Sequence, residues 1–286
     1  MGLVISFFRS RQLERIDYAD LILYFTKELN CSVVSTDEEV KITFHDDIFD
    51  YDYDFLITKR SRVNNLALLN PEYVNIRFLI DLPIVLPEQA SRQIILVLDK
   101  ICKKFQFVVF YDGLNDIQPL NLVALMKHMS EIKETYLLNN VTDDLYYLDS
   151  SVITHIANYH QSLSFLKEEL GEDVELNKYQ MLTNNVNKKV FLAVPWENGK
   201  PTVFPPHLDY VIVKDHGVEQ FLSAELFLKK LGRATTELKD YIPNVSLLYL
   251  DKKHTSKAQR VIKRLSKYFE HDLVFSHVYI TNIVEK

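Results

Sequence analysis

An amphipathic stretch between two β-like runs constrains the fold of this chain more than any other feature. Residues 88–105 (EQASRQIILVLDKICKKF) follow Pro87 and repeat apolar side chains at helical spacing. The runs VNIRFLIDL (74–82) and FVVFY (107–111) on either side are rich in β-branched and aromatic residues. A helix with one apolar face must bury it, so this stretch predicts a helix that covers a sheet.

The same alternation of strands and helices continues along the chain. The remaining strands are expected at 3–8, 39–44, 53–58, 151–155, 188–194, 208–214, 245–250 and from 273 to about 284. The remaining helices are expected at 16–29, near 119–130, and at 158–170, 218–231 and 255–269. The Asn-Gly pair in ENGKP (197–201) indicates a hairpin turn. Adjacent Asn and Asp residues in LLNNVTDD favour turns, which places a domain boundary there and divides the chain into 1–139 and 140–286.

The two halves share local patterns in the same order. DFLITK (54–59) and DYVIVK (209–214) have the form D-[FY]-[LV]-I-x-K, and FLID (78–81) corresponds to LYLD (248–251). We therefore expect an α+β fold of two tandem, duplicated α/β units, each a mixed or antiparallel sheet covered by helices. The alternative is coincidental alternation within one α/β chain.

Composition and motifs exclude several chemistries. The chain has only six Gly in 286 residues, and it contains no Walker A, dinucleotide-binding, nucleophile-elbow or H-E-x-x-H motif, so no cofactor is expected. Its two cysteines could form at most one disulfide, which is too few to stabilise a chain of this length and fits free thiols in a reducing compartment. The sequence shows no signal peptide and no membrane-spanning stretch, so a cytoplasmic location is expected.

The stretch HDDIFDYDYDF (45–55) is the most unusual local composition. Its Asp50, Asp52 and Asp54 have the spacing of an EF-hand loop, but Phe55 and Ser61 occupy the positions that require Gly and Glu, so no metal site is expected. Residues 53–58 form the expected strand, which leaves the acidic connection before it as the candidate partner-binding surface. Its members are Asp46, Asp47, Asp50, Tyr51 and Asp52.

Trp196 and Glu197, just before the Asn-Gly turn, are expected to form a second partner-binding patch. The only tryptophan of the chain is either an exposed anchor for a partner or a cap on the core at the end of a strand.

These observations favour a non-enzymatic protein-binding module whose acidic and aromatic surface binds a partner protein, as in an immunity protein that neutralises a toxic effector; an acidic surface fits a basic partner. That comparison is one of class alone. One alternative is an enzyme with dispersed Asp and His residues in a cleft between the halves. The other is a nucleic-acid-associated regulator that uses the basic helix 255–269, although the net charge of −6 disfavours nucleic acid as a partner. The cations of that helix are Lys257, Arg260, Lys263, Arg264 and Lys267.

Overall fold

The computed structural model divides the chain into two compact units, Met1–Asp144 (unit 1) and Leu145–Lys286 (unit 2). It describes residues 2–140, 144–184, 186, 189–243, 245–271 and 273–286. The boundary expected after residue 139 coincides with the end of helix α3.

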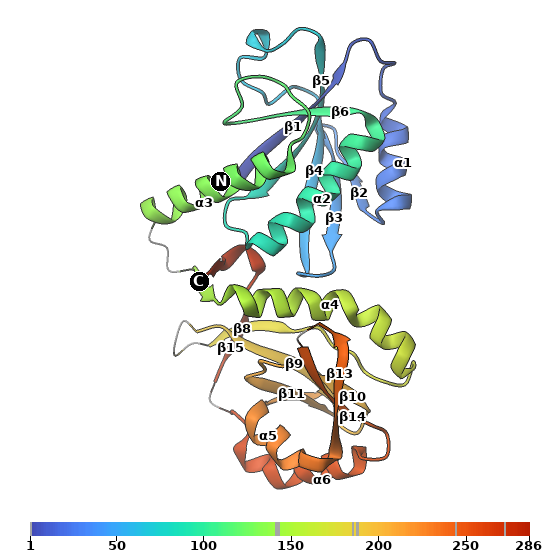
Figure 1. Ribbon diagram of the computed structural model, residues 1–286, viewed down its shortest axis with the longest axis vertical. Coiled ribbons are helices and arrows are strands. Elements are labelled where there is room, and N and C mark those ends of the chain that lie inside the picture. Colours follow the sequence, from blue (N-terminus) through green and yellow to red (C-terminus); the bar gives the residue numbers. More distant parts are fainter. Residues whose placement is uncertain (1, 141–143, 185, 187–188, 244, 272) are drawn as a thin grey trace. The chain divides into compact units, whose positions relative to one another are not determined.

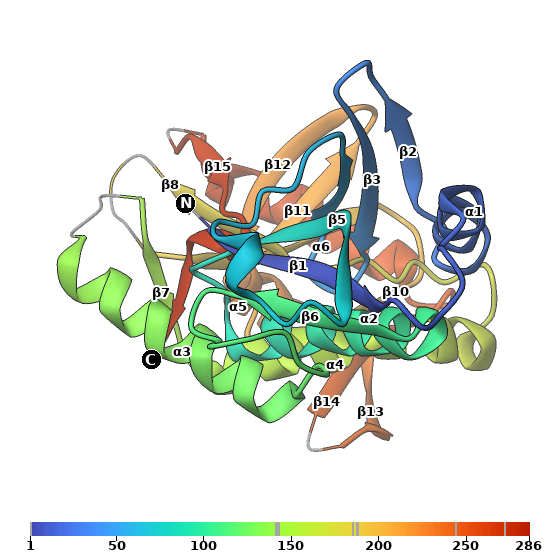
Figure 2. The same cartoon turned by 90° about the horizontal axis from the view of Figure 1, so that it is seen from above.

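Unit 1 is built on one six-stranded sheet in which all neighbouring strands are antiparallel, in the order β2-β3-β4-β5-β1-β6 (Figure 1). The strands are β1 (Gly2–Ser10), β2 (Ser32–Ser35), β3 (Glu39–Asp46), β4 (Tyr51–Thr58), β5 (Tyr73–Pro83) and β6 (Phe107–Tyr111). The helices are α1 (Tyr18–Glu28), α2 (Glu88–Phe105) and α3 (Leu122–Asn139). Helix α1 lies beside β2 and β3, whereas α2 contacts β6 and α3 (Figure 2).

The core of unit 1 confirms the helix predicted at 88–105 and the two strands predicted to flank it. Helix α2 spans the predicted residues, and Ala90, Ile94 and Ile101 are buried. Phe78 of β5 is at the centre of an aromatic cluster whose other rings come from β1, α1, β4 and β6. These rings are Phe7, Phe25, Phe55 and Phe107, with centroids 4.8 to 6.3 Å from that of Phe78. Cys31 and Cys102 are buried free thiols, and burial raises the pKa of each.

Unit 2 contains three sheets. A five-stranded sheet has the order β12-β11-β9-β8-β15, a three-stranded sheet the order β10-β14-β13, and β16 pairs with β7. The strands are β7 (Tyr146–Leu148), β8 (Gln180–Asn184), β9 (Phe191–Glu197), β10 (Thr202–Phe204), β11 (Tyr210–Asp215), β12 (Val218–Ser223), β13 (Thr235–Ile242), β14 (Val245–Leu250), β15 (Phe275–His277) and β16 (Ile283–Glu285). The pair β9–β11 is parallel and the other pairs of the five-stranded sheet are antiparallel, so that sheet is mixed, whereas β7 and β16 pair in parallel and the three-stranded sheet is antiparallel.

Three helices complete unit 2: α4 (Ser150–Leu170), α5 (Ala224–Leu231) and α6 (Thr255–Leu265). Helix α5 contacts β11, β12 and α6. Ala258, Val261 and Leu265 of α6 are buried, as the helical spacing predicts. Phe269, which follows in the same register, is buried as well.

The structure corrects four local predictions in the second half. Residues 151–155 are the first turns of α4 and not a strand. The expected helix 218–231 is a strand and a short helix, β12 and α5, because β12 pairs along its whole length with β11. The turn at Asn198-Gly199 forms, but it joins strands of different sheets and not a hairpin. The expected strand from 273 to about 284 is two short strands, β15 and β16.

The fold class is α+β, but a duplication is not shown. The strand that would match β1 is helical, and the two proposed counterparts β4 and β11 have different surroundings. Strand β4 has antiparallel neighbours on both sides, whereas β11 is parallel to β9. Among the described residues, no helix is both long enough and apolar enough to cross a membrane.

Candidate functional site

The acidic connection of unit 1 is the turn of the β3–β4 hairpin. Cross-strand pairing puts His45 opposite Asp52, and its Nδ1 lies 2.8 Å from the Asp52 Oδ1. The His45 Nε2 lies 3.6 Å from the Asp47 Oδ1 and 3.5 Å from the Asp50 Oδ1. The Asp47 and Asp50 side chains are 85% and 84% exposed, so the turn presents them to solvent. We call Asp47, Asp50 and Asp52 with His45 the acidic tip.

The structure separates Asp46 and Tyr51 from the acidic tip. The Asp46 carboxylate is buried, and its Oδ1 accepts a hydrogen bond from the Ile48 N–H at 2.9 Å, which closes the turn. Tyr51 is half-buried, and its ring packs edge-on against that of Tyr53 at 4.9 Å. Asp46 and Tyr51 therefore shape the hairpin, and Asp46 is too buried to contact a partner.

Asp46 predicts a pH-dependent stability. Burial raises its pKa, only partly opposed by hydrogen bonds from the backbone of Ile48 and Phe49, and its Oδ2 has no hydrogen-bond partner in the described part of the chain. A carboxyl whose folded-state pKa is raised stabilises the fold when protonated, and that stabilisation is lost as the pH rises through the folded-state pKa. We therefore expect Asp46→Asn to raise the free energy of unfolding at pH 7 by about 1 kcal/mol.

The advantage of Asp46→Asn should shrink on acidification and vanish below about pH 4, the unfolded-state value for Asp. Urea unfolding of both proteins at several pH values measures it. Asp47→Asn, next in the chain and exposed, is the matched control and should change the stability little at any pH. A stability loss in Asp46→Asn at pH 7 would contradict the interpretation.

The two residues of the second expected patch differ in burial: Trp196 lies in the core and Glu197 at the surface. Trp196 is fully buried in β9, where it packs on Phe204 and Phe227, and its Nε1 donates to the Lys200 carbonyl at 2.9 Å. Of the two roles expected from the sequence, Trp196 therefore has the one in the core, and the expectation of an exposed anchor is wrong. Glu197 is exposed but pairs with Lys200, which lowers the pKa of Glu197 by a side-chain hydrogen bond.

Two histidines that are far apart in the sequence meet in unit 2. His155 of α4 stacks on His207 with ring centroids 4.9 Å apart, and the His155 Nδ1 lies 2.9 Å from the His207 Nε2. Burial and the neighbouring ring lower the pKa of His155. A hydrogen bond between the two rings requires one of them to accept, and only a neutral imidazole can do so. In the residues that the structure describes, no three His, Cys, Asp or Glu side chains are arranged to hold a metal ion.

A charged surface of unit 2 is formed by α5 and α6, which pack against each other. The apolar side of α6 faces the core, so its polar side is exposed, and its sequence TSKAQRVIKRL contains no Asp or Glu. The last turn of α5 and the 3-10 turn after it add further exposed cations beside α6. We call the following residues the basic face: Lys229, Lys230, Arg233, Lys253, Lys257, Arg260, Lys263, Arg264 and Lys267.

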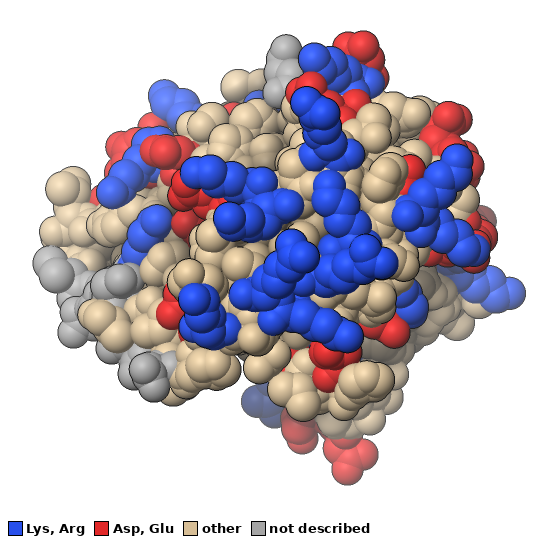
Figure 3. All heavy atoms as spheres, turned by 90° about the horizontal axis from the view of Figure 1, so that it is seen from below, with Lys and Arg blue, Asp and Glu red and all other residues tan. Residues whose placement is uncertain are grey.

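The cations of the basic face are not neutralised. Within the described part of the chain, none of them has a carboxylate oxygen within 4.0 Å, whereas Lys214 and Lys239 of the neighbouring sheets are paired with Glu219 and Glu237. Figure 3 shows Lys and Arg gathered on the side of unit 2 where α5 and α6 lie. The sequence interpretation found the cations of α6 but missed those of α5, because it placed them in a longer helix with no relation to α6.

Comparison of the chain with protein-family models, with curated proteins and with solved structures found no match. A function is therefore inferred from the surfaces described above.

Proposed function

We propose that this chain is a nucleic-acid-binding protein that engages the phosphate backbone through the basic face of unit 2. The observation that carries the proposal is the set of exposed cations on α5 and α6 without carboxylate partners. Lys and Arg that neutralise phosphates release condensed counterions, and this supplies most of the affinity of non-specific binding. The net charge of −6 of the whole chain does not oppose this, because screening limits charge effects to about 10 Å.

The arrangement of side chains favours nucleic acid over an anionic membrane surface. A helix that lies in a membrane interface inserts its apolar face between the lipids. Ala258, Val261, Ile262 and Leu265 of α6 are instead buried in the protein. Tyr268, 50% exposed at the end of the basic face, offers a ring on which an unpaired base can stack.

A salt titration of binding tests the proposal. The full chain is titrated with a fluorescent mixed-sequence duplex DNA and with a single-stranded RNA between 50 and 200 mM salt. We expect log K to fall linearly with log salt concentration, with a slope of about −0.9 for each phosphate contacted on the duplex. A flat response, or binding to anionic vesicles alone, would overturn the proposal.

A second candidate function is supported by the acidic tip. Asp47, Asp50 and Asp52 are exposed around a single His45, so this turn presents excess negative charge to a basic protein partner. The proposal retains the expected non-enzymatic module of the immunity type, with its contact surface reduced to these side chains.

Charge changes at the acidic tip test that candidate. We expect Asp47→Lys combined with Asp50→Asn to weaken binding of a lysine-rich peptide several-fold, because both side chains are exposed and can approach its cations. Asn is chosen at position 50 because its φ of 51° is one that Asn tolerates. The control is Asp37→Lys with Asp20→Asn, two exposed acids of unit 1 outside the tip. Equal binding by the two double variants, or a lower thermal stability of the tip variant alone, would count against this candidate.

A further inference from the structure

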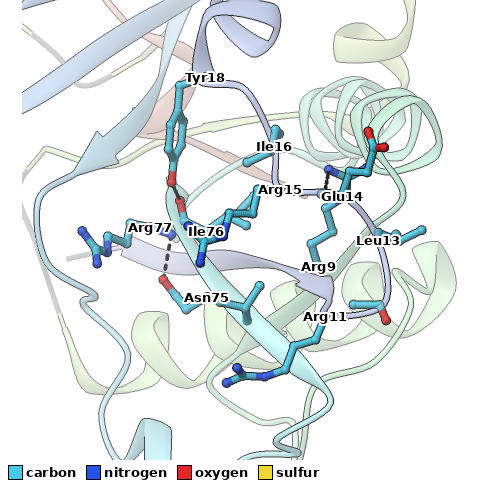
Figure 4. A pocket seen from close by; sticks show the side chains of 12 residues that line it. Arg9, Arg11, Leu13, Glu14, Arg15, Ile16, Tyr18, Asn75, Ile76 and Arg77 are labelled. Atoms are coloured by element: carbon cyan, nitrogen blue, oxygen red, sulfur yellow. Dashed lines mark hydrogen bonds between the residues drawn. The ribbon is translucent and has the colours of Figure 1, made fainter.

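A hollow in unit 1 is lined by four arginines. It has a volume of about 560 Å³ and lies between the end of β1, the connection to α1 and the beginning of β5 (Figure 4). Arg9, Arg11 and Arg15 come from the segment RSRQLER, and Arg77 comes from β5. We call this hollow the arginine pocket. It lies in the half of the chain that carries most of the net negative charge. The pocket is therefore a local cluster of positive charge in an otherwise acidic half.

An irregularity in the β1–β5 pairing builds the pocket. Ser6 pairs with Leu79 and Phe8 pairs with Asn75, so β5 carries two more residues than β1 across this interval. Arg77 lies within the bulge with a φ of 54°, a conformation that is costly for a long side chain. The Asn75 Oδ1 accepts from the Arg77 N–H at 2.7 Å, and the Tyr18 hydroxyl donates to the Ile76 carbonyl at 2.5 Å. These bonds hold a strained backbone that directs Arg77 out of the ladder.

Within the described residues, three of the arginines are held by backbone carbonyls and not by acids. The Arg9 Nη1 donates to the Glu14 carbonyl at 2.7 Å, the Arg11 Nε to that of Pro71 at 2.7 Å, and the Arg77 Nη1 to that of Lys59 at 2.9 Å. Each guanidinium has five N–H donors, so most of them remain for a ligand. A carbonyl fixes the position of a guanidinium without neutralising its charge, which preorganises the pocket for an anion.

Two further observations point to a missing anionic partner. The Arg9 Nε is buried and has no hydrogen-bond partner in the described chain. A buried donor without an acceptor destabilises the fold, and a ligand oxygen that accepts from it would remove that cost. Among the residues that the structure describes, Glu14 is the only acid that lines the pocket, and its carboxylate points away from Arg11 and Arg77 in Figure 4.

The cationic surface continues beyond the pocket. A second hollow of about 730 Å³ shares Arg11 and Arg77 with the first and adds Lys59 and Arg60. The charge of Arg77 also acts on Tyr18: burial raises the pKa of Tyr18, and Arg77 opposes that shift.

We propose that the arginine pocket binds a small phosphorylated molecule of the nucleotide class. Guanidinium groups match phosphate oxygens in paired, parallel hydrogen bonds, which favours phosphate at the arginines. Leu13, Ile16 and Val74 line the same pocket and provide apolar surface for the non-phosphate part of the ligand. The volume lies within the range of sites that take up small molecules of this size. The inference concerns unit 1 and does not depend on the proposed function of unit 2.

Calorimetric titration of the full chain with four probes tests the ligand class. We expect pyrophosphate to bind, adenosine 5′-diphosphate to bind at least tenfold more tightly, and adenosine not to bind. Citrate, which carries comparable charge on carboxylates, should bind at least tenfold more weakly than pyrophosphate. Absence of binding by both phosphorylated probes, or equal binding of citrate and pyrophosphate, would overturn the phosphate assignment. Equal binding of pyrophosphate and the nucleotide would overturn the nucleotide assignment.

Variants locate the binding in the pocket. Arg15→Gln removes an exposed guanidinium that makes no hydrogen bond within the described chain, and Arg77→Asn removes a second guanidinium while keeping a residue that tolerates positive φ. We expect each to weaken nucleotide binding at least tenfold, and Arg15→Lys to recover part of the loss. Arg62→Gln is the matched control, because Arg62 lies on the same unit but pairs with Glu39 outside the pocket. Unchanged binding in Arg15→Gln, which should fold normally, would overturn the site.

The variants also separate this inference from the proposed function. Arg15→Gln should leave the salt dependence of nucleic-acid binding unchanged, and charge removal on the basic face should leave nucleotide binding unchanged. Loss of nucleotide binding in the basic-face variants would overturn the assignment of the ligand to unit 1.

Discussion

Trp196→Ala should lower the free energy of unfolding by about 3–5 kcal/mol, the usual cost of removing a large aromatic side chain from a core. Trp196 is fully buried and packs against Phe204 of β10 and Phe227 of α5, with ring centroids 6.1 and 5.3 Å away. The variant leaves a cavity between the five-stranded sheet, the three-stranded sheet and α5. It also removes the Nε1 donor from the Lys200 carbonyl.

The measurement is urea unfolding followed by far-UV circular dichroism, because the variant has no tryptophan fluorescence. Trp196→Phe is the control that keeps an aromatic ring and loses the Nε1 hydrogen bond, and its expected cost is about 1–2 kcal/mol. A destabilisation below about 1 kcal/mol in Trp196→Ala would contradict the central position of this ring. Because Phe227 belongs to α5, the same variant should also disturb the basic face.

Single helices with one apolar face could be predicted because their signal is local. The spacing of Ala90, Ile94 and Ile101 predicts the buried side of α2, and that of Ala258 and Val261 does the same for α6. In both helices the 3.6-residue periodicity can be recognised without knowing which distant residues the helix contacts.

The first turns of α4 show where local patterns mislead. Residues 151–155 (SVITH) contain β-branched side chains, which favour a strand when taken alone. Yet Ile153, Ile156 and Ala157 continue the helical spacing that reaches Leu166, and all four are buried. The helical spacing of the whole segment therefore outweighed the β propensity of its first five residues.

Burial separated the candidate residues in a way that composition could not. Asp46 and Asp47 are adjacent and chemically identical, but strand β3 ends at Asp46, whose carboxylate turns inward to bind the Ile48 N–H. Trp196 faces the core for a related reason: Phe204 of the three-stranded sheet and Phe227 of α5 cover its side of β9. Which side of a strand is buried depends on packing between sheets, and a short stretch of sequence does not contain that information.

The arginine pocket could not be predicted for a different reason. Three of its arginines lie within seven residues, which is a visible signal, but Arg77 joins them only through the register of β1 with β5. The bulge that displaces Arg77 has no glycine to mark it, since Arg77 itself adopts the positive φ. A site that depends on strand register can be predicted only when the order of strands in the sheet is known, and local sequence patterns do not contain that order.

Removing charge from the basic face should have the largest effect on nucleic-acid binding. Lys257, Arg260 and Arg264 follow one line along α6 and are exposed. We expect the triple variant Lys257→Gln, Arg260→Gln, Arg264→Gln to reduce the slope of log K against log salt by about 0.9 for each phosphate that the variant no longer neutralises. If counterion release supplies the whole contribution of three such phosphates, affinity for duplex DNA at about 0.15 M salt falls roughly a hundredfold.

The matched control removes the same number of charges from cations that already have acidic partners. These are Lys189, Lys214 and Lys239, which pair with Asp209, Glu219 and Glu237. Their replacement by Gln should change the slope by less than that of the basic-face variant, although it alters the net charge equally. Gln is a good helix former, so α6 should remain intact in the test variant, which circular dichroism checks. Equal slopes for the two triple variants would mean that net charge alone governs binding, and the basic face would then have no specific role.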